Sequence, residues 1–98
     1  MDARTVWVVK DDGSDIIRAD AIAGVGRDYN GYITARLAGG QGPAVTLVAP
    51  ASGAPATPED FHRQLIRTAA ELSDTSEPRV IRPTWDELSG WHWVSERL

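Results

Sequence analysis

The sequence predicts an α+β fold, in which a small antiparallel sheet of four or five strands, arranged as a meander, packs against one amphipathic helix. Three observations predict it. Runs of β-branched and aromatic residues alternate with glycine-containing turns over 4–49. A loop rich in proline and alanine occupies 50–57. A segment with the apolar period of a helix follows within 58–98. At 98 residues, the whole chain, 1–98, is expected to form a single domain.

Turn residues set the bounds of the predicted strands. The acidic segment 11–15 contains an Asp-Gly pair, which is typical of a solvated hairpin tip because glycine accepts the positive φ of a tight turn. The segment 19–23 either continues the second strand or forms a short helical turn. Further turns are predicted at 28–31 and 39–43, and the four strands at 5–10, 16–18, 32–37 and 44–49.

The main helix is expected directly after the loop. Thr57 is a good N-cap and Pro58 suits the first helical position, while the acidic residues that follow complement the positive end of a helix. Apolar residues then recur at the spacing of one helix face, which we expect to pack on the sheet; they are Phe61, Leu65, Ala69 and Leu72, with Ile66 beside them.

The C-terminal segment carries two predictions and one open alternative. The segment 79–82 lies between prolines, which suits an added edge strand. Thr84 is followed three residues later by a glutamate, and this capping-box pattern predicts a short helix. The tail 91–98 fits either an extended segment, in which Trp91 and Trp93 share one face, or a continued helix.

Charge and composition limit the partners. Ten Lys and Arg against fourteen Asp and Glu give a net charge of −4, which argues against nucleic acid as the main partner because phosphates bind to basic surfaces. The chain has no cysteine, and a secreted domain of this size would often need disulfides, so a cytoplasmic location is expected. No apolar segment approaches the roughly 20 residues that span a bilayer, so no membrane partner is expected.

No motif for catalysis, cofactor or metal is complete. The twelfth residue of a calcium loop starting at Asp11 would be Ile22, which cannot bind the ion. A Gly-x-Gly pair has Tyr29 in place of the third glycine of a dinucleotide fingerprint, so we interpret the pair as turn residues. His62 and His92 are the two histidines and lie too far apart for a helical zinc pair. We therefore expect no cofactor, no metal and no catalytic residue.

The tryptophans are the most informative feature for function. Three of the four lie near the end of the sequence, Trp85, Trp91 and Trp93, with His92 among them. They either close the core of a small domain or form an interaction surface. Because one helix covers one face of a sheet, the other face must be covered by this tail or by a second chain. The sequence thus predicts a non-catalytic protein-interaction or regulatory module that binds a protein partner or forms a homodimer.

The alternative is a small-molecule or nucleotide-binding domain, which could be enzymatic, with its pocket between the sheet and the C-terminal segment. Arg18, Arg27 and Arg36 recur at nine-residue intervals and are the candidates for binding an anionic ligand.

Overall fold

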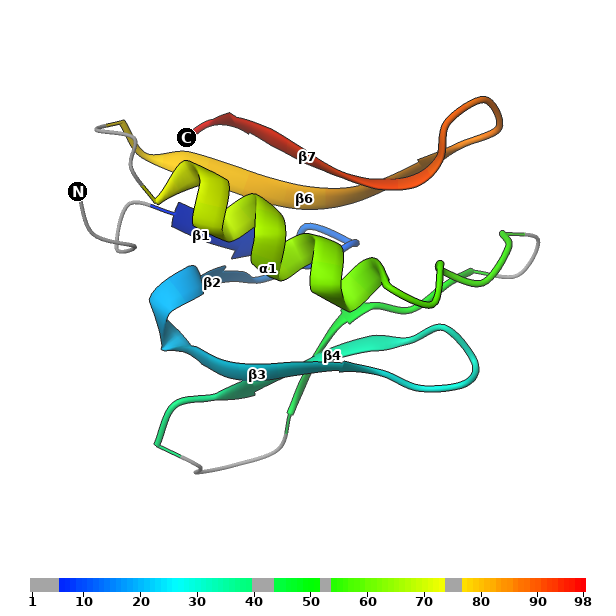
Figure 1. The fold of residues 1–98 in the computed structure, drawn as a ribbon, viewed down its shortest axis with the longest axis horizontal. Helices are drawn as coiled ribbons and strands as arrows, with labels where there is room; N and C mark the ends of the chain where they lie inside the picture. The colour runs from blue at the N-terminus through cyan, green and yellow to red at the C-terminus, as the bar shows by residue number, and fades with distance from the viewer. Residues whose placement is uncertain (1–5, 40–43, 52–53, 74–76) are drawn as a thin grey trace.

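Two sheets and one α-helix make up the described part of the fold (Figure 1). The order of strands is β2-β1-β6-β7 in the four-stranded sheet and β3-β4-β5 in the three-stranded sheet. Helix α1 (Phe61–Leu72) contacts β3 of one sheet and β6 and β7 of the other. The predicted α+β class is confirmed, although the strands divide between two sheets instead of forming one meander. This computed structural model describes residues 6–39, 44–51, 54–73 and 77–98.

The first hairpin forms where the Asp-Gly pair predicts it. Strands β1 (Val6–Val9) and β2 (Ile16–Arg18) pair antiparallel. Gly13 has a φ of 76°, and its N–H donates to the Lys10 carbonyl across the turn. The positive φ explains why glycine stands at this position.

The short helix predicted from Thr84 does not form, because this residue lies in the C-terminal half of the four-stranded sheet. Strand β6 (Arg79–Asp86) continues through that residue, and a tight turn leads into β7 (Gly90–Arg97). The Asp86 carboxylate accepts the N–H groups of Leu88 and Ser89 and so stabilises the turn. Pairing along the whole of β7 outweighs the local capping signal, which stabilises one helix end by only about 1 kcal/mol. The tail is extended, one of the two alternatives left open by the sequence.

The predicted edge strand at 79–82 is also corrected, because β6 lies inside the sheet between a parallel β1 and an antiparallel β7. Strand β1 pairs with 79–81 alone. Pro83 therefore lies beyond the part of β6 that has a neighbour on both sides, so its missing N–H removes no bond to β1.

The three-stranded sheet follows a short helical turn, which resolves the alternative at 19–23. Element η2 (Ala19–Ala21) is a 3₁₀ turn, and the Gly-x-Gly pair interpreted as turn residues lies within a strand instead. The turn at 28–31 is confirmed, whereas most of the turn predicted at 39–43 lies outside the described residues. The strands are β3 (Ile22–Arg27), β4 (Ile33–Leu37) and β5 (Val45–Val48).

Helix α1 begins later than its sequence signals predict. Asp60 is the N-cap, without a side-chain capping bond, and Thr57 is not part of the helix end. Thr57 is 2% exposed, and its hydroxyl donates to the Gly31 carbonyl at 2.7 Å. The predicted apolar face is confirmed, since Phe61 and Leu65 are buried in the core.

One apolar core lies between the two sheets and α1. Every sheet strand except β3 and β7 contributes buried side chains, while Ile22 and Val25 of β3 and Trp91 and Trp93 of β7 are partly buried against the same core. Its buried members are Val6, Val8, Ile17, Ile33, Ala35, Leu47, Val48, Phe61, Leu65 and Ile81.

Candidate binding groove

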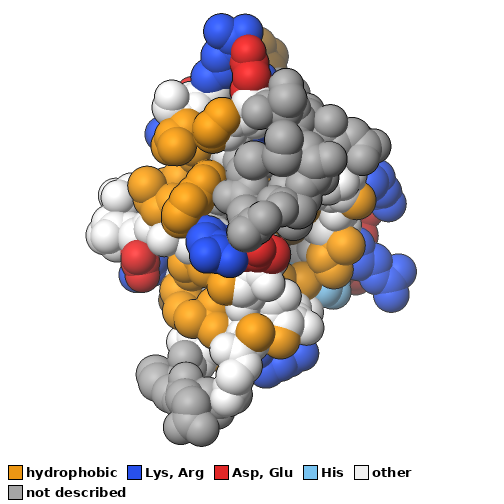
Figure 2. Space-filling view, turned by 90° about the vertical axis from the view of Figure 1, so that its left-hand side faces the viewer, with side chains coloured by type: hydrophobic (Ala, Val, Ile, Leu, Met, Phe, Trp, Pro, Cys, Tyr) orange, Lys and Arg blue, Asp and Glu red, His pale blue; other side chains and the backbone are white. Residues whose placement is uncertain are grey.

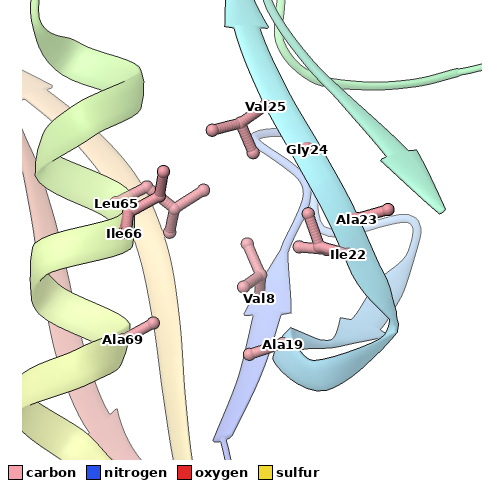
Figure 3. A pocket seen from close by; sticks show the side chains of 9 residues that line it. All are labelled: Val8, Ala19, Ile22, Ala23, Gly24, Val25, Leu65, Ile66 and Ala69. Carbon is pink, nitrogen blue, oxygen red and sulfur yellow. The ribbon is translucent and has the colours of Figure 1, made fainter. Parts of the chain in front are cut away.

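An open groove of about 280 Å³ lies between α1 and β3. Figure 3 shows Leu65, Ile66 and Ala69 of α1 on one side and β3 on the other, with Ile22 and Val25 projecting towards the helix. All nine lining residues labelled there are Gly, Ala, Val, Ile or Leu. The groove therefore offers an occupant no side-chain hydrogen bond.

Apolar surface at this groove remains in contact with water. Ile66 is 58% exposed, because it lies beside the helix face that Phe61 and Leu65 bury. Ile22 and Val25 are half-buried on the facing strand. Hydrophobic side chains also gather in patches on the side face of the molecule, between charged groups (Figure 2). Clustered exposed apolar side chains are typical of binding surfaces.

The outer edge of β3 carries backbone polar groups at Val25, which lines the groove, and at Arg27, which lies beyond the lining residues. Strand β3 has β4 as its one neighbour among the described residues. The Asp28 N–H donates to the Tyr32 carbonyl at the hairpin end. Because antiparallel pairs alternate, the backbone groups of Val25 and Arg27 point away from β4. No backbone hydrogen bond from another part of the described chain reaches these two residues.

Arg36 lies over β3 on the sheet face opposite the core. It is paired in register with Gly24, where an added Cβ would collide with the Arg36 guanidinium. Gly24 therefore leaves the space that lets this cation reach across the strand. In the described part of the chain, no carboxylate forms an ion pair with Arg36.

Arg27 is held by the segment that precedes α1. Its Nη2 donates to the Thr57 carbonyl at 2.6 Å, and its Nε lies 3.2 Å from the Thr57 hydroxyl oxygen. The same hydroxyl donates to Gly31 in the β3–β4 turn. We refer to these three residues as the latch, since they fasten the start of the helical segment to the hairpin that carries β3.

The three arginines proposed for an anionic ligand do not converge. Arg18 is on the four-stranded sheet and forms an ion pair with Asp20 at 2.9 Å. Arg27 shares the sheet face of the buried Ile33, whereas Arg36 points from the opposite face. Because Arg27 and Arg36 lie on opposite faces of one sheet and Arg18 is ion-paired on the other sheet, the structure shows no common site for one anion.

The C-terminal tryptophans pack against the start of α1. The Trp93 ring stacks on Phe61 at 4.6 Å, and its Nε1 donates to the Phe61 carbonyl at 2.8 Å. The Trp91 Nε1 donates to the Pro55 carbonyl at 2.8 Å. Trp85, by contrast, is 36% exposed. His92 lies between the two packed tryptophans in the strand and so projects to the other side of β7, where its Nδ1 is 3.1 Å from the Gly90 carbonyl oxygen.

Two carboxylates with a lowered pKa stabilise turns of the chain. Hydrogen bonds from the Ser14 hydroxyl and N–H hold the pKa of Asp12 below its ordinary value in the first hairpin. The Ser89 N–H, with that of Leu88, lowers the pKa of Asp86 in the same way. Over the described residues, no three His, Cys, Asp or Glu side chains gather as metal ligands. The geometry thus assigns these carboxylates to local structure.

Comparison of the chain with models of protein families, with curated proteins and with solved structures found no match. Within the described ranges, no helix has the length and apolar character that crossing a membrane requires. The groove is therefore the feature of the molecule from which a function can be inferred. Its residues were not among the predicted site residues, although the position of Ile66 at the margin of the apolar helix face is a signal visible in the sequence.

Proposed function

We propose that the protein is a non-catalytic interaction module that binds a segment of a partner protein in the α1–β3 groove. The observation that carries the proposal is a groove that is open to solvent and lined by aliphatic residues and glycine alone. Ile66 at its margin is 58% exposed. Covering such surface on binding releases water from apolar groups, which favours association by about 25 cal/mol per Å² of apolar area.

The small-molecule alternative finds less support in the same groove. Ligand pockets of about 300–1,000 Å³ combine an apolar lining with a few polar groups that orient the ligand. Here the volume is about 280 Å³, and no lining side chain is polar. A nucleotide would also need cations near its phosphates, whereas Arg27 and Arg36 lie on opposite faces of their sheet and Arg18 is ion-paired with Asp20.

Self-association remains a prediction. The sequence predicts it from a sheet face that the helix leaves uncovered. In the structure, however, Trp91 and Trp93 of β7 pack against the core. The apolar surface that a second copy would bury is therefore the groove. Light scattering at micromolar concentration measures the mass, and a dimer that Ile66→Glu converts to a monomer would identify a second copy as the partner.

A peptide-display selection tests the proposed function directly. Random peptides are selected on the immobilised wild-type protein and then assayed on Ile66→Glu and Ile16→Glu. Ile16 is the matched control, since it is 47% exposed on β2 and does not line the groove. We expect apolar peptides that bind wild type and Ile16→Glu but lose binding to Ile66→Glu, with all three proteins folded by circular dichroism. Peptides that bind all three proteins equally would refute the proposal.

A further inference from the structure

We propose that the groove takes an extended peptide that pairs with β3 as an added strand, with alternate apolar side chains in the groove and an acidic side chain at Arg36. The inference rests on the proposed function and specifies the chemistry of its partner. Three features carry it: the unpaired edge of β3, the aliphatic lining, and the position of the Arg36 guanidinium.

The open edge of β3 favours a bound peptide whose backbone is extended. The N–H and C=O groups of Val25 and Arg27 point away from β4, and no other described segment pairs with them. An extended chain places its own backbone groups about 4.8 Å from a neighbouring strand and satisfies both residues. A helix in the groove would keep its backbone bonds internal and leave these groups unpaired.

The lining selects the side chains on one face of that peptide. Val25 shares the core face of β3, and residues directly opposite each other in a sheet share a face. A peptide residue opposite Val25 therefore projects towards Leu65 and Ile66 of α1. Since successive side chains of a strand alternate, every second residue of the peptide should be apolar.

Arg36 favours an acidic side chain on the face of the peptide that points away from the core. Its guanidinium lies over Gly24, in the space that a Cβ would fill. It therefore stands above β3, about one strand spacing from the added strand on the face opposite the core. No described carboxylate is paired with it. An acidic residue of the peptide on this face would meet an exposed cation with which no described carboxylate forms an ion pair.

Hydrogen exchange with a defined peptide tests the added strand. The probe is acetyl-Glu-Val-Glu-Val-Glu-Val-Glu-amide, which carries both predicted side-chain types in alternation. In the free protein, the amides of Gly24 and Gly26 should be protected by β4, while those of Val25 and Arg27 exchange freely. Saturation with the peptide should slow exchange at Val25 and Arg27 and leave the two glycines unchanged.

Two altered peptides separate the backbone and charge contributions. In an antiparallel added strand, the valine N–H groups are the donors that face β3, because directly opposite residues exchange their hydrogen bonds. Methylation of the valine nitrogens removes these donors without changing a side chain, and we expect affinity to fall by about tenfold or more. Replacement of glutamate by lysine should weaken binding by roughly two- to fivefold. Arg36→Glu should reverse that charge preference. Arg67→Glu, an equal charge change at an exposed position of α1, should leave it intact.

The outcomes distinguish this inference from the proposed function. Binding that Ile66→Glu abolishes, but that neither slows exchange at Val25 nor depends on the valine N–H groups, would refute the added strand and keep the interaction module. Protection of Val25 in a peptide-free dimer would identify a second copy as the occupant and also overturn the inference. If neither this probe nor any selected peptide binds in the groove, both proposals fail.

Discussion

Within the latch, one buried hydroxyl group joins the segment before α1 to the turn of the β3–β4 hairpin. Thr57→Val keeps the shape of the side chain and removes that hydroxyl. The Thr57 Oγ1 donates to the Gly31 carbonyl at 2.7 Å, and the residue is 2% exposed, so water cannot replace the lost bond without opening the segment. We expect the variant to be destabilised without a change of fold.

The size of the effect follows from the remaining contacts. A buried acceptor left without its partner costs about 1–3 kcal/mol. Arg27 keeps its 2.6 Å bond to the Thr57 carbonyl, so its guanidinium is not left unpaired. It therefore adds little to the loss of free energy of unfolding. We therefore expect a loss of about 2 kcal/mol in the free energy of unfolding, which in a domain of this size lowers Tm by roughly 10 °C.

Urea unfolding followed by tryptophan fluorescence measures this loss as a shift of midpoint at unchanged slope. Thr57→Ser is the control, because it keeps the hydroxyl and removes one methyl group, at a cost of about 1 kcal/mol. If Thr57→Val proves as stable as wild type, or more stable than Thr57→Ser, the hydroxyl does not hold the latch and the reasoning is wrong.

Three further predictions concern the turns and the tryptophans. Gly31→Ala should lower Tm more than Gly39→Ala, because both glycines have positive φ, 89° and 100°, but a Cβ at Gly31 alone would meet a backbone nitrogen, at 2.9 Å. Trp93→Ala should lower the free energy of unfolding, measured with urea, by about 3 kcal/mol, and Trp85→Ala by less than about 1 kcal/mol. The reason is that of these two tryptophans only Trp93 stacks on Phe61. The pKa of the Asp86 carboxyl is lowered in the fold, so its charged form should stabilise the protein at any pH above the unfolded-state pKa. This stabilisation should be lost as the pH falls through the folded-state pKa. Thermal unfolding should therefore show wild type more stable than Asp86→Asn at neutral pH, with the difference shrinking in acid.

Sequence signals predicted structure correctly where the partners are close in the chain. Gly13 closes a hairpin between neighbouring strands, and the turn at 28–31 does the same. Signals failed where a partner outside the local motif competed for the residue. Thr57 has the character of an N-cap, yet its hydroxyl bonds to Gly31, 26 residues away. Thr84 begins a capping box, yet pairing with β7 keeps it in a strand.

The groove depends on contacts that no local pattern contains. Ile66 adjoins an apolar helix face, yet it is 58% exposed at the margin of the groove. Gly24 belongs to a pair interpreted as turn residues, but in β3 its missing side chain makes room for Arg36. The candidate tryptophans were identifiable from their number, whereas the stacking of Trp93 on Phe61 requires the β6–β7 hairpin to fold over the helix start.

The parallel pairing of β1 with β6 has a consequence for how the chain is made. Val6 lies opposite Arg79, so β1 acquires its second neighbour only when a much later segment has left the ribosome. Until then the β1–β2 hairpin presents an unpaired strand edge, which is a template for association with other chains. Contacts this far apart in sequence also form slowly, because a long loop must close first. We therefore expect biosynthesis to be a stage at which this protein depends on protection from aggregation.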